Sequence, residues 1–390
     1  MAKHTLVVTQ QCNLRCTYCY VSKSDTVMPL STARRAIDLA FANTPAGETV
    51  DIGYFGGEPL LEFGLMQDIT AAIKVHPEYR RERVVLSVIS NGTLYSDEIA
   101  DYLEREQIHL CVSCDGPPEI QDRARRYLSG RPTSAVVERN IKRAAERFPD
   151  LRVNAVYRPD TVQGLARTVE YLASLGVTQI HLNPDYSAGW SAADAAALPG
   201  WYAQVGELYS RYRLQERPLF VSLIDSKIAV ILRGGYQAGE VCRMGSAEFA
   251  YTAAGWIYPC ERLVGDGIGG DHCIGNVDSG LRPLGKCCGA TNPECATCGL
   301  ACYCMRWCGC SNYFGTGRYD RASAFLCASE RASIQTAFDV FCRLEKRGPA
   351  FFDHASGLPH ADSLSAAAPL PARGQAVRFI PLHKGDLHNG

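Results

Sequence analysis

The stretch Cys12-Asn13-Leu14-Arg15-Cys16-Thr17-Tyr18-Cys19 places three cysteines at the spacing C-x3-C-x2-C. It follows an apolar, strand-like run, His4–Thr9. Three thiolates on one tight loop can hold three irons of a [4Fe–4S] cube, which leaves the fourth iron open to another ligand. The alternatives are a zinc loop or ordinary buried cysteines, but zinc sites usually complete four ligands and no Cys or His stands at a typical spacing. The stretch therefore predicts an iron–sulfur cluster at the end of a first strand.

Apolar runs and stretches of helical periodicity alternate through the first half of the chain. Six strand-then-helix units in series imply parallel strands with right-handed crossovers. We therefore predict an α/β fold, a partial (β/α)6 TIM-like barrel over residues 1–195, with its chemistry at the C-terminal ends of the strands. Ser31, Ser96 and Thr161 are suited to cap helices. The expected strands are His4–Thr9, Val50–Phe55, Val84–Ile89, Ile108–Ser113, Val153–Tyr157 and Gln179–Leu182, and the expected helices fall near 31–42, 62–76, 96–105, 134–147 and 162–175.

The bulk composition is that of a globular protein. The 390 residues are 46% hydrophobic and 21% charged, with a formal net charge of -1. A sizeable core can form, and nothing calls for nucleic acid or an anionic membrane as a partner. No apolar run is long enough to cross a bilayer, and no signal peptide precedes the first strand. These features predict a cytoplasmic protein.

Cysteine is the exception, with 18 residues. In a cytosolic chain of this length such a number indicates metal or redox chemistry. Most cysteines outside the opening loop lie between Cys242 and Cys327. We predict linking helices over 196–235 and a small cysteine-rich domain over 236–347 that needs cross-links or metals to hold its shape. The Ala- and Pro-rich tail over 348–390 is expected to be disordered or loosely docked.

Small and polar residues stand at the ends of the second, third and fourth expected strands. They are Gly56-Gly57-Glu58-Pro59, Ser90-Asn91 and Ser113-Cys114. Paired glycines allow the backbone to approach a ligand closely, and the Glu58 carboxylate can accept a hydrogen bond from an ammonium group. Ordinary turns are the alternative interpretation of these segments. We expect Cys114 to be buried as a small apolar side chain.

Together these motifs resemble those of radical S-adenosylmethionine (SAM) enzymes. The resemblance implies that the open iron binds SAM and that the Gly-Gly-Glu-Pro segment meets its amino group. Tyr18 would lie against the adenine or shield the cluster, and Arg125 would pair with the SAM carboxylate, with Arg123 and Arg126 as alternatives. The cofactor-binding residues implied in this way are Tyr18, Gly56, Gly57, Glu58, Pro59, Ser90, Asn91, Ser113 and Arg125, and the ligands of the first cluster are Cys12, Cys16 and Cys19.

A second pattern of cysteines runs C-x12-G-x4-C from Cys242, then C-x2-C-x5-C-x3-C from Cys295, and ends at Cys327. It resembles the SPASM extension found behind radical SAM domains, and a cysteine-rich zinc module is the alternative. The resemblance implies two auxiliary [4Fe–4S] clusters, three clusters in all. The first would be held by Cys242, Cys260 and Cys308, and the second by Cys295, Cys298, Cys304 and Cys327.

The first auxiliary cluster has only three cysteines in this pattern. Either it has an open iron, which could bind a substrate thiolate, or Cys273, Cys287 or Cys288 supplies the fourth ligand. Cys302 and Cys310 have no place in the pattern. Glu261 follows Cys260, and the chain is also similar to anaerobic sulfatase-maturating enzymes, in which an Asp at this step is a proposed base. That similarity implies a catalytic Glu261, whereas a salt bridge to Arg262 is the alternative.

The resemblance implies an oxidoreductase that generates a 5′-deoxyadenosyl radical, which abstracts a hydrogen atom from a peptide or protein. We expect maturation of a ribosomal peptide (RiPP) through a thioether or C–C cross-link. The alternatives are formylglycine formation in a sulfatase and a non-enzymatic iron–sulfur electron carrier. The chain leaves no room for a peptide-recognition domain before the first strand, so a separate recognition protein is a possible partner. A reductant such as flavodoxin or ferredoxin is also implied.

Overall fold

The computed structural model describes residues 1–238, 240–282 and 289–345. Within them the chain forms two compact units. The described parts of the first unit are 1–154, 174–177 and 243–282, and those of the second are 155–173, 178–238, 240–242 and 289–345. The domain boundaries expected from composition, 1–195, 196–235 and 236–347, divide the chain differently and stay a prediction. The expected tail over 348–390 lies outside the described residues.

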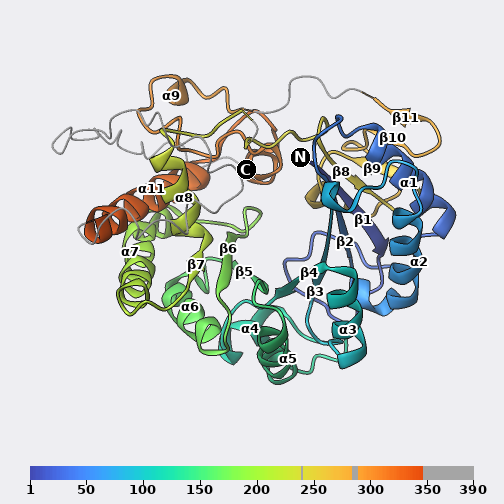
Figure 1. Ribbon diagram of the computed structural model, residues 1–390. Coiled ribbons are helices and arrows are strands. Elements are labelled where there is room, and N and C mark those ends of the chain that lie inside the picture. The colour runs from blue at the N-terminus through green and yellow to red at the C-terminus, as the bar shows by residue number, and fades with distance from the viewer. Residues whose placement is uncertain (239, 283–288, 346–390) are drawn as a thin grey trace. The chain divides into compact units, whose positions relative to one another are not determined.

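Parallel strands in sequence order build the first unit. β1 (Ala2–Thr9), β2 (Val50–Gly56), β3 (Val84–Ser90) and β4 (Ile108–Ser113) pair successively, and β4 pairs with the first half of β5 (Arg152–Tyr157). The helices α1 (Leu30–Ala42), α2 (Phe63–Lys74) and α3 (Asp97–Glu106) cover one face of these strands (Figure 1). The strand-helix alternation predicted from the sequence is confirmed, because β1 to β4 fall within two residues of the expected runs.

The strands of this unit have two different faces. In β2, Val50, Ile52 and Tyr54 are buried, and the Tyr54 hydroxyl lies 2.7 Å from Thr70 Oγ1 on α2. Asp51 and Phe55 alternate with them and are only partly buried. Because successive side chains of a strand point to opposite faces, the helix-covered face is apolar, and the other face is free to carry polar groups.

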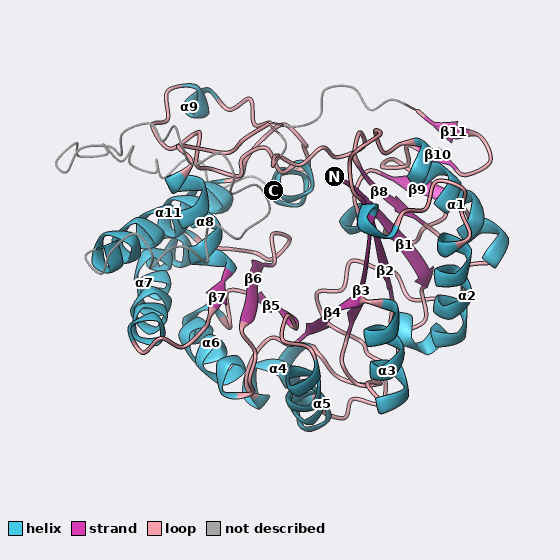
Figure 2. Ribbon diagram, viewed as in Figure 1, coloured by secondary structure: helices cyan, strands magenta, loops and turns pink. Residues whose placement is uncertain are grey.

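Further short strands extend the first unit beyond β1. β8 (Glu248–Tyr251) runs parallel to β1, and β9 (Trp256–Tyr258), β10 (Gly275–Asn276) and β11 (Gly280–Leu281) follow in antiparallel order (Figure 2). Lys3 is the register partner of Glu248. The residues of β8 that pair with β1 thus lie 245 positions later in the sequence. The strands β8 to β11 have two to four residues each and lack the alternation that would have predicted them.

The second unit contains the end of β5, β6 (Gln179–Pro184) and β7 (Phe220–Val221). Three long helices pack together in it: α7 (Ala192–Leu214), α8 (Ser222–Leu232) and α11 (Ala324–Leu344). Across the residues that the structure describes in both units, the remaining helices are α4 (Pro118–Ala124), α5 (Ser134–Arg147), α6 (Leu165–Ser174), α9 (Pro293–Ala296) and α10 (Gly309–Thr316), with 3-10 turns η1 (Pro59–Glu62), η2 (Arg81–Arg83), η3 (Val162–Gly164) and η4 (Glu261–Leu263). None of the helices in the described ranges is both long and apolar enough to cross a bilayer.

One of the expected helix caps is confirmed. Ser96 caps α3, and its Oγ accepts from the Ile99 amide at 3.3 Å. The Ser31 cap is wrong, because α1 already begins at Leu30 and Pro29 stands at the cap position. Proline presets the backbone dihedral φ close to helical values and so favours an early start. Thr161 flanks η3 without a side-chain cap bond.

Candidate radical SAM site

The three-cysteine loop is pinned by backbone hydrogen bonds to the segment that carries Arg125. The Arg15 amide donates to the Arg126 carbonyl at 2.8 Å, and the Thr17 amide donates to the Ala124 carbonyl at 3.1 Å. Leu14, in the middle of the loop, is fully buried. A loop with a buried apolar anchor and paired backbone groups holds its thiols in fixed places, as a cluster site requires.

The thiols of this loop are spread too widely for one ion. Among the described residues, the only three Cys, His or acidic side chains whose ligand atoms all lie within 4.8 Å of one another are Glu248, Cys260 and Glu261. Two thiolates on one tetrahedral zinc would lie about 3.8 Å apart. A cube places each thiolate on its own iron and needs a wider spread. The three thiols therefore do not enclose a single ion, and the cluster stays a prediction.

The two glycines at the end of β2 pack against the backbone that leads into the cysteine loop. A Cβ atom on Gly56 would lie 2.1 Å from the Thr9 carbonyl oxygen, and one on Gly57 would lie 2.0 Å from that of Gln11. The Gly57 amide donates to Thr9 O and the Glu58 amide donates to Gln11 O, both at 2.8 Å. At these atoms the paired glycines therefore approach the backbone of the protein itself, at Thr9 and Gln11, and not a ligand.

The carboxylate of Glu58 ties the ends of β2 and β3 together. The side chain is fully buried. It accepts from Ser90 Oγ at 2.9 Å, from the Asn91 amide at 2.6 Å and from the Leu60 amide at 3.1 Å. Burial raises the pKa of Glu58, and these donors oppose that rise. The contact of Glu58 with a SAM amino group stays a prediction.

Two residues that sequence reasoning missed connect the loop to the end of β3. Asn91 Nδ2 donates to Asn13 Oδ1 at 2.8 Å, and Asn13 Nδ2 donates to Thr93 Oγ1 at 2.8 Å. The Thr93 hydroxyl in turn donates to Asn91 Oδ1 at 2.6 Å. Asn13 stands between two cysteine ligands, so its position was the available signal. Ser113, at the end of β4, is the register partner of Asn154.

Tyr18, Asp115 and Arg125 form a polar group beside the thiols. The Tyr18 hydroxyl donates to Asp115 Oδ2 at 2.6 Å and accepts from Arg125 Nη1 at 2.6 Å. Arg125 is buried, whereas Arg123 and Arg126 are exposed. Within the described residues, the buried Nε of Arg125 has no hydrogen-bond partner. A buried guanidinium donor without a partner fits an anionic group such as the SAM carboxylate.

Two cations, Arg125 and Lys23, lie near the thiols of this loop. Burial raises the pKa of Cys16, and Arg125 opposes the rise, while Cys19 and Cys12 are near enough to influence the same thiol. Lys23 Nζ lies 3.4 Å from Cys19 Sγ. Metal ligation requires the thiolate, so the two cations support cluster assembly.

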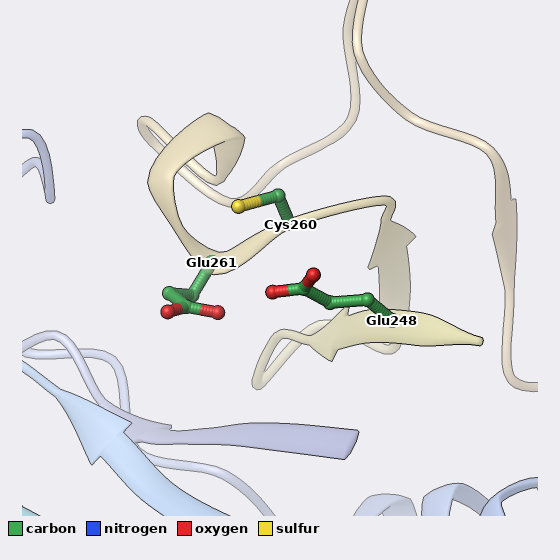
Figure 3. A group of neighbouring side chains, drawn as sticks. All are labelled: Glu248, Cys260 and Glu261. Carbon is green, nitrogen blue, oxygen red and sulfur yellow. The ribbon is translucent and has the colours of Figure 1, made fainter. Parts of the chain in front are cut away.

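Glu261 lies in a charged group with Lys3 and Glu248, drawn without Lys3 in Figure 3. Lys3 Nζ is 2.9 and 3.1 Å from the two Glu261 oxygens and 3.6 Å from Glu248 Oε1. Burial alone would raise the pKa of Glu261, but the Lys3 ammonium holds it below its ordinary value. Glu261 is therefore ionised, and the ion-pair partner that the structure gives it is Lys3, a residue that sequence reasoning missed.

Tyr20 connects this charged group to the cysteine loop. It follows Cys19 directly and stacks on Phe55, with ring centroids 6.1 Å apart. Burial raises the pKa of Tyr20, and Glu261 and Cys260 raise it further. These couplings show that Glu261 and the three-cysteine loop approach the same side chain.

Four of the predicted auxiliary ligands gather in the second unit. Burial raises the pKa of Cys295, and Cys327 and Cys298 contribute to the rise. Cys298 also acts on Cys327, and Cys327 acts on Cys304. As in the opening loop, no three of these thiols lie within 4.8 Å of one another. This spread fits the predicted second auxiliary cluster.

The predicted ligands of the first auxiliary cluster fall in both units, Cys260 in the first and Cys242 and Cys308 in the second. The thiols of Cys308 and Cys310 lie 3.6 Å apart. Cys302 is exposed, and Cys114 is buried as expected. Cys273 Sγ lies 3.2 Å from the Gly275 carbonyl oxygen. Cys287 and Cys288, the other candidates for a fourth ligand, lie outside the described residues.

Comparisons with known proteins agree with this site. Residues 6–172 match the Radical SAM superfamily. A cysteine-type anaerobic sulfatase-maturating enzyme of Clostridium perfringens is 28% identical over 272 residues, which cover 65% of this chain and 72% of that enzyme. The structure of native anSMEcpe with bound AdoMet and Cp18Cys peptide superposes with a TM-score of 0.71 at 18% identity, over 88% of this chain and 99% of that one. Streptococcus suis SuiB bound to the precursor peptide SuiA gives 0.56 at 15% identity, over 83% and 75%.

The segment 6–172 is therefore a radical SAM domain, a class that binds SAM and a [4Fe–4S] cluster. The α/β fold of the chain, including the cysteine-rich region behind that domain, is the fold shared with anSMEcpe and SuiB.

Proposed function

We propose that the protein is a radical SAM oxidoreductase that modifies a peptide or protein, with a cross-link in a ribosomal peptide as the product. The observation that carries the proposal is the polar group of Tyr18, Asp115 and Arg125 beside the three-cysteine loop, in which the buried Nε of Arg125 has no hydrogen-bond partner among the described residues. When bound, SAM and the cluster supply the one-electron chemistry that removes a hydrogen atom from an unactivated carbon.

The residues of this chain divide the work of binding. Cys12, Cys16 and Cys19 hold the first cluster, and Arg125 with Asn91 and Ser113 orients SAM. Glu58 and the two glycines of β2 fix the loop relative to the strand ends. Tyr20 and Phe55 exclude water on the side that faces Glu261, since a reactive radical must meet only its target.

Glu261 accepts a proton from the substrate during its oxidation. It is ionised by Lys3 and therefore able to accept, and it is coupled to the side chain next to the loop. Cys242, Cys260 and Cys308 would hold one auxiliary cluster and Cys295, Cys298, Cys304 and Cys327 the other, three clusters in total with the first, and these would supply an acceptor for the second electron. The fold supports the proposal of a peptide or protein substrate, because the part shared with anSMEcpe and SuiB extends well beyond the radical SAM domain.

Formylglycine formation is the second candidate. It is favoured by the curated relatives, which include cysteine-type and serine-type anaerobic sulfatase-maturating enzymes. The two candidates differ in their products. A cross-link removes two hydrogens from the peptide, whereas formylglycine from cysteine loses sulfur and two hydrogens and gains one oxygen from water.

The test uses the iron-loaded protein, SAM and dithionite under anaerobic conditions. Two probes are offered: a short precursor peptide encoded beside the gene, and a cysteine peptide copied from a sulfatase. We expect 5′-deoxyadenosine, and a mass loss of two hydrogens in the first probe only. Modification of the sulfatase probe alone would favour the second candidate, and absence of 5′-deoxyadenosine from fully loaded protein would favour an electron carrier.

A matched pair of variants tests the base. Glu261→Gln keeps the shape of the side chain and should lower peptide modification by about 100-fold or more, while 5′-deoxyadenosine still forms. Glu248→Gln changes the other carboxylate near Lys3 and should lower modification much less. Equal effects of the two substitutions would show that Glu261 only takes part in a salt bridge.

A further inference from the structure

A deeply buried ion pair joins α8 to α11 in the second unit. Lys227 Nζ lies 2.6 Å from Glu330 Oε2, and the two side chains are only 6% and 7% exposed. Taking two charges out of water costs several kcal/mol per ion, and an apolar pair of similar volume is often no less stable. Stability alone therefore does not account for charges at this depth.

Both members of the pair bind the backbone on either side of Cys304. Lys227 Nζ donates to the Tyr303 carbonyl at 3.1 Å, and the Met305 amide donates to Glu330 Oε2 at 2.6 Å. Lys227 Nζ also lies 3.2 Å from the Tyr236 hydroxyl. The segment 303–305 is thus held by a cation before its central cysteine and an anion after it.

The two charges act on the sulfur itself. Burial raises the pKa of Cys304, the Glu330 carboxylate raises it further, and the Lys227 ammonium lowers it. Cys304 is coupled in the same way to Cys327 on α11. Reduction potentials of iron–sulfur clusters depend on nearby charge, on hydrogen bonds and on burial, so a charged group this close to a ligand sulfur acts on the potential.

We propose that Lys227 and Glu330 are positioning residues for the second auxiliary cluster, and that their charges shift its reduction potential in opposite directions. This inference rests on the proposed function, because it takes Cys295, Cys298, Cys304 and Cys327 as the ligands. A positive charge nearby stabilises the reduced cluster, which carries one more electron, and a negative charge destabilises it.

The experiment is a redox titration followed by electron paramagnetic resonance. The full chain carries Cys12→Ala, Cys16→Ala and Cys19→Ala to remove the signal of the first cluster, and the signal in question is the one that Cys295→Ala abolishes. Lys227→Met should lower the potential. Glu330→Gln should raise the potential, because it removes a negative charge. The amide oxygen of the new side chain can still accept from the Met305 amide. We expect the ratio of reduced to oxidised cluster to change about tenfold in each case, which is about 59 mV for one electron.

Two controls separate charge from packing. Lys227→Arg keeps the charge and should leave the potential unchanged. Asp225→Asn alters another buried carboxylate of α8, which accepts from the Tyr209 hydroxyl at 2.6 Å, and should also leave it unchanged. Opposite shifts for the two charge-removing variants support the inference, and shifts of one sign or none overturn it.

The design also covers a folding failure. If Lys227→Met does not load iron, the potential must still rise in Glu330→Gln and stay constant in Lys227→Arg, or the inference is wrong. A parent protein that never shows a signal dependent on Cys295 overturns the proposed auxiliary cluster, and this inference with it. A normal parent signal with unmoved potentials overturns the inference alone.

Discussion

Two lysine–glutamate pairs stand next to predicted iron ligands, and they differ in exposure. Lys3 and Glu261 lie beside Cys260 in the first unit, with side chains 38% and 15% exposed. Lys227 and Glu330 flank Cys304 in the second unit and are 6% and 7% exposed. Solvent can reach the first pair in part, whereas α8, α11 and the segment 303–305 bury the second pair.

The difference agrees with the two roles proposed above, a proton-accepting Glu261 in the first pair and a supporting pair in the second. A carboxylate that takes a proton from a substrate has to be reached by that substrate, and Glu261 is partly accessible. The carboxylate of Glu330 accepts from Lys227 and from the Met305 amide, so its role is directed to the protein. We therefore propose that the same two residue types serve different purposes because their burial differs.

The largest expected effect tests this contrast through stability. Lys227→Ala leaves a buried, unpaired carboxylate and should lower the free energy of local opening around α8 and α11 by about 3–5 kcal/mol. Lys3→Ala breaks a partly exposed pair and should lower the free energy of local opening around β1 by about 1 kcal/mol or less. Native-state hydrogen exchange read by mass spectrometry measures both. Similar losses at the two sites would contradict the distinction.

The neighbour of Lys3 on β1 offers a pH test on the opposite face of the strand. His4 is fully buried, its ring nitrogens lie 3.0 Å from Tyr251 Oη and from Thr44 Oγ1, and burial lowers its pKa to about 4. The unfolded chain takes up this proton near pH 6.5, so it binds more protons than the folded protein between the two pKa values. Folding stability should therefore fall by about 3 kcal/mol as the pH drops from about 6.5 to about 4.

The measurement is thermal or urea unfolding of the metal-loaded protein across that pH range, compared with His4→Gln. The variant has no group that titrates there, so its stability should fall less steeply. Parallel pH profiles for the two proteins would show that His4 is not the group responsible.

The smallest expected effect concerns a third cation, Arg125, which is buried like Lys227 but is predicted to pair with the SAM carboxylate. Arg125→Lys keeps the charge and removes the bidentate fork, so SAM should bind about 10- to 100-fold more weakly. Equilibrium dialysis with labelled SAM gives the affinity. Arg126→Lys, an exposed neighbour, should leave it unchanged, and the reverse ranking would assign the carboxylate to Arg126.

Local patterns predicted the fold well. Strand alternation and the C-x3-C-x2-C spacing are encoded within short windows, so β1 to β6 and the loop could be located from the chain alone. The Ser31 cap failed because Pro29 competes for the start of the same helix. The strands β8 to β11 could not be predicted, since each has two to four residues and depends on partners far away in sequence.

Candidate ligands could be named from the sequence, and they stay a prediction, whereas the residues that surround them could not be named. The spacing of the cysteines and the Gly-Gly-Glu-Pro motif are both visible in short stretches of the sequence. The Lys3–Glu261 pair joins residues 258 positions apart, and Lys227–Glu330 joins residues 103 positions apart. A lone lysine near the chain start or inside a helix has no local pattern. Only packing of β8 on β1, or of α11 on α8, brings the opposite charge within reach.

The glycine pair at the end of β2 has a practical consequence for changing the specificity of this protein. A Cβ atom at Gly57 would lie 2.0 Å from the main-chain oxygen of Gln11, so no other amino acid fits at Gly57 unless the loop moves. Saturation mutagenesis libraries should therefore leave Gly57 unchanged.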